Sequence, residues 1–151
     1  MTDSRENGRL ALVTGASRGI GRAIASQLAD AGFMVVGTAT TESGAAAIDS
    51  WLGPMGGAGL VMNVTDVESI AAAMKVIAAR FGAPLVLVNN AGVTRDNILM
   101  RMKENEWSDV IDTNLNAIYR LSKSCLRGMT KARWGRIINI SSVVGSMGNA
   151  G

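Results

Sequence analysis

A glycine-rich segment between an apolar run and an amphipathic segment constrains this chain most. The apolar run covers residues 10–13, the glycine segment is Thr14-Gly15-Ala16-Ser17-Arg18-Gly19-Ile20-Gly21, and the amphipathic segment continues to Ala31. This order predicts a strand, a tight turn and a helix. Glycines let backbone N–H groups approach an anion, and the helix start adds unpaired donors and the positive end of its dipole. The segment therefore indicates a pyrophosphate site. A tight turn that binds nothing is the alternative, because the spacing is G-x-x-x-G-x-G rather than G-x-G-x-x-G.

Strand and helix patterns alternate along the rest of the chain. We expect strands at about residues 34–38, 60–64, 85–88 and 137–140, and helices at about 43–52, 66–81 and 104–132. Thr65-Asp66-Val67-Glu68 has the form of a capping box at the start of the third helix. The alternation predicts an α/β fold, a Rossmann-type doubly wound parallel sheet with helices on both faces, present through its fifth strand only.

We expect residues 1–151 to form one NAD(P)-binding domain that is incomplete at its C-terminal end. Residues 1–9 are polar and of mixed charge, and we expect a loose tail there. Residues 141–151 are rich in glycine and serine, and their composition predicts a mobile segment.

The composition excludes several classes of function. The chain has no histidine and a single cysteine, Cys125, which excludes Ser-His-Asp chemistry and an internal disulfide and argues against a metal site. A net charge of +3 and 4% aromatic residues do not favour nucleic-acid binding. No apolar run is long enough to span a membrane, and the polar start is unlike a signal peptide. We therefore expect a soluble, cytoplasmic protein.

Each predicted strand ends in small or hydrogen-bonding residues. These ends are the Gly15 loop, residues 38–41, Asn63, Asn89-Asn90 and Ser141-Ser142. In open α/β sheets, ligands bind beyond the carboxyl ends of the strands. The five ends together predict a binding rim.

The end of the second strand bears on which dinucleotide fits. An NAD site places an acid there to hold the ribose 2′-hydroxyl, whereas a 2′-phosphate requires a cation. The strand here runs into Thr38-Ala39-Thr40-Thr41, and Arg18 in the glycine segment could meet a phosphate. The lack of an acid at this strand end, together with Arg18, favours NADP. Glu42 is a rival ribose ligand that we place past the strand end, and a solvated Arg18 is the alternative role for that cation.

Asn114 falls on the apolar stripe of the long predicted helix. That stripe consists of Trp107, Val110, Ile111, Ile118, Leu121, Cys125 and Met129. A buried amide needs hydrogen-bond partners. Asn114 therefore either bonds to a helix or backbone neighbour or faces a reaction centre, and the sequence leaves both readings open.

Taken together, these motifs resemble the short-chain dehydrogenase/reductase family. The resemblance is carried by Thr14-Gly15-x-x-x-Gly19-Ile20-Gly21, Asn63-Val64, Asn89-Asn90-Ala91-Gly92, Asn114 and Ser142, and it covers the chain from about Arg9 onwards. The segments 92–103 and 142–149 are similar to one branch of that family, the bacterial 3-oxoacyl-acyl-carrier-protein reductases of type II fatty-acid biosynthesis.

The resemblance implies hydride transfer from NADPH to the 3-keto group of a carrier-linked acyl thioester, in an enzyme that is a homotetramer. It implies that Ser142 hydrogen-bonds the substrate carbonyl and that Asn114 anchors a proton-relay water. The implied cofactor-binding residues are Gly15, Ala16, Ser17, Arg18, Gly19, Ile20, Gly21, Thr40, Asn63, Val64, Asn90, Ala91 and Gly92. The basic residues Lys123, Arg127, Lys131, Arg133 and Arg136 could dock an acidic carrier protein, or could simply complement the helix dipole.

The sequence departs from the family pattern in one respect. The family's acid is a tyrosine, with a lysine four residues on, downstream of the serine, and the printed sequence ends before such a pair. Tyr119 and Lys123 have the same spacing but precede Ser142, and at about 100° per residue they point away from Asn114. We therefore expect residues 1–151 alone to be inactive. The alternatives are another short-chain reductase, such as one acting on acetoacetyl-coenzyme A, and a non-catalytic nucleotide-binding fragment.

Overall fold

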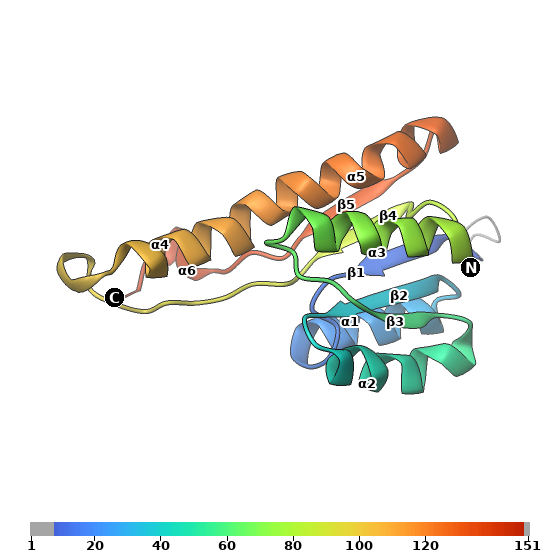
Figure 1. Ribbon diagram of the computed structural model, residues 1–151, viewed down its shortest axis with the longest axis horizontal. Coiled ribbons are helices and arrows are strands. Elements are labelled where there is room, and N and C mark those ends of the chain that lie inside the picture. Colours follow the sequence, from blue (N-terminus) through green and yellow to red (C-terminus); the bar gives the residue numbers. More distant parts are fainter. Residues whose placement is uncertain (1–7, 150–151) are drawn as a thin grey trace.

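Five parallel strands form the central sheet. The computed structural model describes residues 8–149. The strands are β1 (Leu10–Val13), β2 (Met34–Ala39), β3 (Ala58–Val61), β4 (Val86–Asn89) and β5 (Arg136–Asn139), and their order in the sheet is β3-β2-β1-β4-β5 (Figure 1). The predicted doubly wound parallel sheet is therefore confirmed. The strand order reverses between β1 and β4, and their carboxyl ends form the switch point at which such sheets bind ligands.

Two helices cover each face of the sheet. Helices α1 (Gly19–Asp30) and α2 (Glu42–Leu52) lie on one face, and α3 (Val67–Arg80) and α5 (Ala117–Ala132) lie on the other (Figure 1). Alternate strand residues point to the two faces, so the sheet contributes to two apolar clusters. One cluster joins Leu12 and Val36 to α3 and α5, and the other joins Val13 and Val35 to α1 and α2.

The start of α3 differs from the predicted capping box. Asp66 is the N-cap, and its carboxylate accepts hydrogen bonds from the backbone N–H groups of Glu68 (2.9 Å) and Ser69 (3.3 Å). Thr65 instead donates from its backbone N–H (3.1 Å) and its hydroxyl (2.8 Å) to Asn63 Oδ1. The reason is that β3 ends at Val61 rather than at the predicted residue 64, which leaves residues 62–66 free to form a turn.

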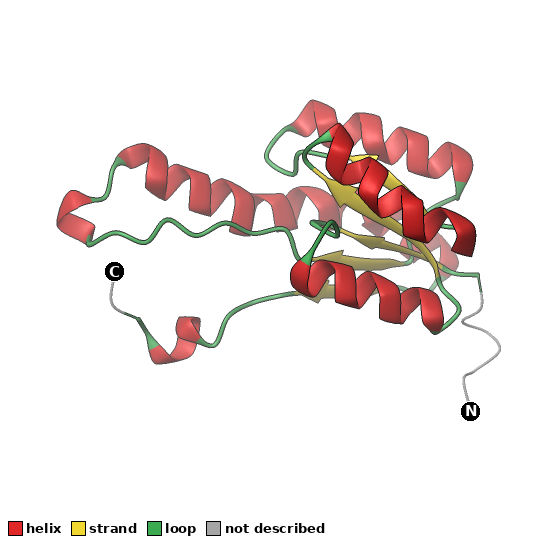
Figure 2. Cartoon of the chain, turned by 90° about the horizontal axis from the view of Figure 1, so that it is seen from below, coloured by secondary structure: helices red, strands yellow, loops and turns green. Residues whose placement is uncertain are grey.

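The predicted helix over residues 104–132 is interrupted. It consists of α4 (Glu104–Ile111), a π-helical segment η3 (Asp112–Asn116) and α5. Of the predicted apolar stripe only Leu121, Cys125 and Met129 are buried, all three in α5 and together with Ala117. The prediction that the stripe extends to Trp107 is wrong, because α4 projects past the end of the sheet, where no layer covers it, and Trp107 is 54% exposed (Figures 1 and 2).

The two predicted terminal tails lie partly outside the described residues. Residues 1–7 and 150–151 are not described. Gly8 donates its N–H to the Gly32 carbonyl (3.1 Å), and the Arg9 carbonyl accepts from Met34 N–H (3.0 Å), so these two residues are not part of a loose tail. The segment after β5 contains a short helix, α6 (Val144–Met147), which the composition did not predict.

Strand β5 forms an open edge of the sheet within residues 8–149. It pairs with β4 on one side, and all four of its residues are exposed. Its apolar side chains Ile137 and Ile138 are 36% and 45% exposed. Exposed apolar strands of this kind are normally covered by another layer or another chain.

Thr14, directly after β1, joins β1 to β4. Its hydroxyl oxygen accepts hydrogen bonds from the backbone N–H groups of Asn90 (3.1 Å) and Ala91 (3.0 Å), and its O–H donates to the Val88 carbonyl (3.4 Å). The Asn90 side chain in turn donates Nδ2–H to the carbonyls of Thr14 (2.9 Å) and Gly15 (3.1 Å). We call this set of bonds the β1–β4 seam. Because Thr14 is only 1% exposed, water cannot replace its hydroxyl.

Thr14→Val should destabilise the protein, because the shape is kept while two backbone N–H groups lose their acceptor. Buried unsatisfied donors cost about 1–3 kcal/mol each, so we expect a loss of roughly 2–4 kcal/mol in the free energy of unfolding, measured with urea. Thr130→Val, an exposed site near the end of α5, is the matched control and should change stability by less than about 0.5 kcal/mol. Equal effects for the two variants would show that the Thr14 hydroxyl makes no special contribution to stability.

Cys125 should be inert in the folded protein. Its side chain is buried on the face of α5 that packs against the sheet, and burial raises the pKa of its thiol to about 12. The reactive thiolate is therefore scarce near neutral pH. We expect labelling by a thiol reagent at pH 8 to be slow for the folded protein and fast in urea, as followed by mass spectrometry. Equally rapid labelling in both conditions would contradict the burial of α5 against the sheet.

Candidate functional site

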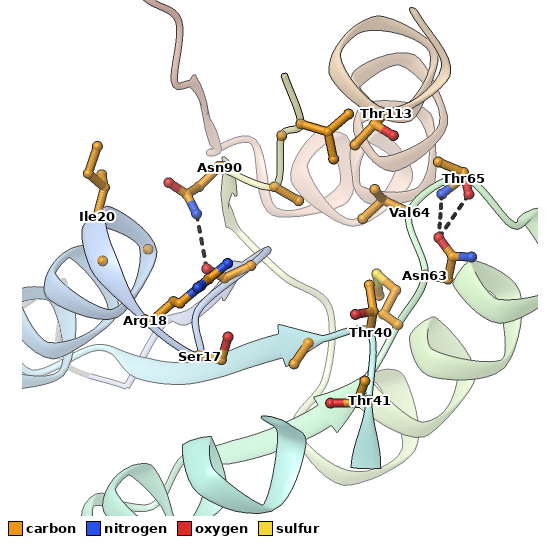
Figure 3. Close-up of a pocket in the computed structure, with 18 of the residues that line it drawn as sticks. Ser17, Arg18, Ile20, Thr40, Thr41, Asn63, Val64, Thr65, Asn90 and Thr113 are labelled. Carbon is orange, nitrogen blue, oxygen red and sulfur yellow. Dashed lines mark hydrogen bonds between the residues drawn. The ribbon is translucent and has the colours of Figure 1, made fainter. Parts of the chain in front are cut away.

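A cavity of about 780 Å³ lies at the carboxyl edge of the sheet, around the switch point (Figure 3). Its walls come from the glycine segment, the end of β2, the turn after β3, the loop after β4 and the helical arm formed by α4 and η3. The lining residues are Gly15, Ser17, Arg18, Gly19, Ile20, Gly21, Ala39, Thr40, Thr41, Met62, Asn63, Val64, Thr65, Asn90, Ala91, Gly92, Val93, Arg95, Asp109 and Thr113.

The glycine segment provides an uncapped helix start. Gly15 has φ +65°, a conformation that favours glycine, and a Cβ on Gly21 would overlap the Gly15 carbonyl oxygen and the Asn90 amide. Arg18 occupies the N-cap position of α1 in an extended conformation, and its side chain makes no capping hydrogen bond. The first N–H groups of α1 therefore lack a side-chain acceptor at the cavity wall, which is the geometry that binds phosphate groups.

The end of β2 forms the neighbouring wall. Thr40 and Thr41 line it, and the Thr41 hydroxyl caps α2 by accepting from Gly44 N–H (3.1 Å). Glu42 is already the first residue of α2 and does not line the cavity. Figure 3 shows Arg18 and Ser17 close to this wall. Asp109 on α4 is the one carboxylate among the lining residues, so the β2 wall itself carries no acid.

The loop after β4 is fixed to α4 and η3 by charged and amide contacts. Arg95 Nη2 lies 3.3 Å from Asp109 Oδ2, with about half of each side chain exposed. Glu106 accepts from the backbone N–H of Lys103 (2.7 Å) and from the Asn97 amide (3.2 Å), and these bonds hold the pKa of its carboxyl below the usual value. This region therefore has a definite shape although it lies beyond the sheet.

Asn114 bonds to backbone rather than lying buried in the apolar stripe. Its Oδ1 accepts from Val93 N–H (2.9 Å) and its Nδ2–H donates to the Val93 carbonyl (2.8 Å). The side chain is exposed, so the expectation of a buried amide is wrong; the η3 segment turns it out of the stripe towards the loop. Val93 itself lines the cavity, and Asn114 thus holds part of the wall.

The structure gathers most, but not all, of the predicted site residues. Every predicted cofactor-binding residue except Ala16 lines the cavity, and Ala16 is buried beside it with its N–H donated to the Thr38 carbonyl (2.9 Å). Ser142 follows β5 at the same edge of the sheet but does not line the cavity. It is exposed, and its hydroxyl accepts from Val144 N–H (3.3 Å).

Several lining residues were not among those predicted. Thr65 reaches the cavity from the turn after β3, and Val93, Arg95, Asp109 and Thr113 reach it because the loop after β4 returns along α4 and η3. The polar residues around Arg95 were a weak indication that this loop belongs to the site. The positions of Asp109 and Thr113 depend on the register of η3. No pattern in the sequence reports that register.

Tyr119 and Lys123 contact each other but not the cavity. Lys123 Nζ donates to the Tyr119 hydroxyl (3.3 Å), and Tyr119 is 64% exposed. Neither residue lines the cavity. The pair therefore lies outside the site.

Other kinds of site find no support in the part of the chain that the structure describes. Residues 8–149 contain no group of three or more histidine, cysteine or acidic side chains placed to hold a metal ion. Within that same range, no helix combines the length and the hydropathy needed to cross a bilayer.

Comparisons with known proteins identify the family. A family model described as short chain dehydrogenase matches residues 9–151. The chain is 65% identical over 144 residues to a 3-oxoacyl-[acyl-carrier-protein] reductase of Vibrio harveyi, covering 95% of this chain and 59% of that protein. It is 63% identical over 146 residues to the reductase of the same name from Pseudomonas aeruginosa, and 60% identical over 144 residues to that of Escherichia coli, with the same shares covered. The chain thus spans about 59% of the length of the curated relatives it matches, and on the match over residues 9–151 it belongs to the short-chain dehydrogenase family.

Proposed function

We propose that residues 1–151 carry the cofactor site of an NADPH-dependent 3-oxoacyl-acyl-carrier-protein reductase of fatty-acid biosynthesis. The observation that carries the proposal is the cavity at the switch point, where an uncapped helix start and Arg18 lie beside a β2 wall without an acid. The names of the relatives support the substrate class.

The residues of the cavity fit a nicotinamide dinucleotide phosphate. The α1 N-terminus and the close backbone at Gly15 and Gly21 suit a pyrophosphate. The exposed Arg18 guanidinium suits a 2′-phosphate, which it can bond through two N–H groups, and Thr40 adds a hydroxyl at the same wall. Asn63, Val64, Asn90, Ala91 and Gly92 would hold the rest of the cofactor.

The chemistry is reduction of a ketone to an alcohol. NADPH supplies the hydride when it is bound. Ser142 would hydrogen-bond the keto oxygen as negative charge develops on it, and Asn114 would hold the wall at Val93 and a proton-relay water. A tyrosine and lysine that follow Ser142 in the family pattern would deliver the proton. Residues 1–151 hold the cofactor side of this arrangement.

The remaining proposals concern binding partners, cellular location and domain organisation. Arg127, Lys131 and Arg133 are exposed at the end of α5 and could attract an acidic acyl carrier protein. The exposed apolar residues of α4, η3 and α5, such as Trp107, Leu115 and Leu126, suit burial in a homotetramer. We place the protein in the cytoplasm, and we propose that residues 8–149 belong to a single domain.

Arg18→Gln should change the choice of cofactor. The variant keeps a polar side chain but loses the cation, so the Kd for NADPH should rise about 10- to 100-fold while the Kd for NADH changes less than about threefold. Quenching of protein fluorescence on titration measures both constants. Arg22→Gln on the exposed face of α1 is the control, because Arg22 lies over the Trp51 ring and outside the cavity. A parallel loss for both cofactors would refute the role given to Arg18.

The natural-length polypeptide should oxidise NADPH with a 3-oxoacyl-carrier substrate, and residues 1–151 alone should not. Absorbance at the nicotinamide band follows both reactions. A higher kcat/KM with acetoacetyl-coenzyme A than with the carrier-linked substrate would favour the coenzyme A reductase instead. Tyr119→Phe should leave turnover unchanged, since its hydroxyl lies outside the cavity. Turnover by the 151 residues alone, lost in Tyr119→Phe, would contradict this assignment.

A further inference from the structure

Arg120 connects two walls of the cavity that come from distant parts of the chain. Its Nη2 lies 2.9 Å from Asp112 Oδ1 on η3, and its Nη1–H donates to the Thr65 carbonyl (3.3 Å) in the turn after β3. Thr65 lines the cavity, and so does Thr113, which is next to Asp112. Figure 3 shows Thr65 and Thr113 near each other in the upper right part of the view.

The turn after β3 is rigid by itself. The Asn63 side chain accepts two hydrogen bonds from Thr65, and Asn63 N–H donates to the Ser69 hydroxyl (2.9 Å). The Asn63 carbonyl also accepts from Asp66 N–H (3.1 Å). The turn therefore moves as one unit with the start of α3.

The η3 segment is bonded both within itself and to the loop after β4. Asn116 Nδ2–H donates to Asp112 Oδ1 (3.0 Å), and Asn114 makes both of its bonds to Val93. Asn116 and Arg120 together hold the pKa of the Asp112 carboxyl below its usual value, so Asp112 stays ionised and available to Arg120 near neutral pH. A π-helical segment of this kind often occurs at a functional site.

Arg120 is the link between these two rigid units. Ala117 and Leu121 pack α5 into the core, whereas no residue of α4 or η3 belongs to either apolar cluster of the described chain. The side chains of Arg120 and Asp112 are 26% and 35% exposed, less than in the Arg95–Asp109 pair. A planar guanidinium can bond to a carboxylate and a carbonyl at once, which the single nitrogen of a lysine does less well.

We propose that Arg120 is a positioning residue that sets Asn114 and Val93 relative to the cofactor wall at Thr65. The proposal rests on the proposed function, since it assigns Arg120 to the same site. The main anchors of the cofactor, the glycine segment and Arg18, do not contact this link, so its loss should affect the reaction geometry rather than cofactor affinity. Small displacements of reacting groups lower rates much more than they lower binding.

Arg120→Met in the natural-length polypeptide tests the proposal. We expect kcat, counted per nucleotide-binding site, to fall about tenfold, while the Kd for NADPH changes less than about threefold. Arg120→Lys should recover part of the rate, because a cation near Asp112 is restored. Lys75→Gln, which removes an exposed charge on α3, is the control and should leave both quantities unchanged. If the Met variant does not fold, Arg120→Lys and Asp112→Asn carry the test with smaller expected losses.

A double-mutant cycle and hydrogen exchange separate positioning from general stability. Asp112→Asn should lower kcat, and the Arg120→Met/Asp112→Asn double variant should be no slower than Arg120→Met, because the two residues act through one link. Amide exchange of Val93 should become faster in Arg120→Met and not in Lys75→Gln. Additive rate losses in the double variant would overturn the proposal. An Arg120→Met variant with the Val93 exchange and the kcat of the parent would also overturn it. If the parent itself bound no nucleotide, the proposed function would fail, whereas the exchange measurement would still decide whether Arg120 orders the wall.

Discussion

The hydrogen bonds of the Thr14 hydroxyl to the backbone of Asn90 and Ala91 are the contacts on which the site depends. They close the β1–β4 seam at the point where the strand order reverses. The glycine segment begins on one side of this seam, and the loop that carries Gly92 and Val93 begins on the other. Because the Asn90 amide bonds in turn to the carbonyls of Thr14 and Gly15, the glycine segment and the cavity wall at Gly92 and Val93 are fixed to each other.

A second set of polar contacts supports the far side of the cavity. The seam orders the two central strand ends, but α4 and η3 lie beyond the sheet and receive little support from the core (Figures 1 and 2). Hydrogen bonds and ion pairs take the place of packing there, at Asn114–Val93, Arg95–Asp109 and Arg120–Asp112. Such polar contacts are individually weak when exposed, so the shape of this part depends on several of them acting together.

The sequence predicted the parts of the structure that local pattern determines. Apolar runs located all five strands, and the small and polar residues at the ends of the first four located part of the cavity wall, because parallel strands bring their carboxyl ends to one edge. The interruption at η3 was not predictable, because the extra residue of a π-helical turn hardly changes the spacing of the apolar residues over 104–132. The same interruption explains why Asn114 left the stripe and why Asp109, Thr113 and Arg120 were missed. The sequence placed Ser142 at the correct edge of the sheet, but the residue does not line the cavity. Its hydroxyl accepts a hydrogen bond from Val144 N–H instead.

A crystal structure of the natural-length polypeptide with NADPH would test the proposed site most directly. We predict the pyrophosphate over the N-terminus of α1, the 2′-phosphate within hydrogen-bond distance of the Arg18 guanidinium, and the nicotinamide on the side of Asn90 and Val93. A nucleotide bound away from the switch point, or a 2′-phosphate that no cation contacts, would contradict it.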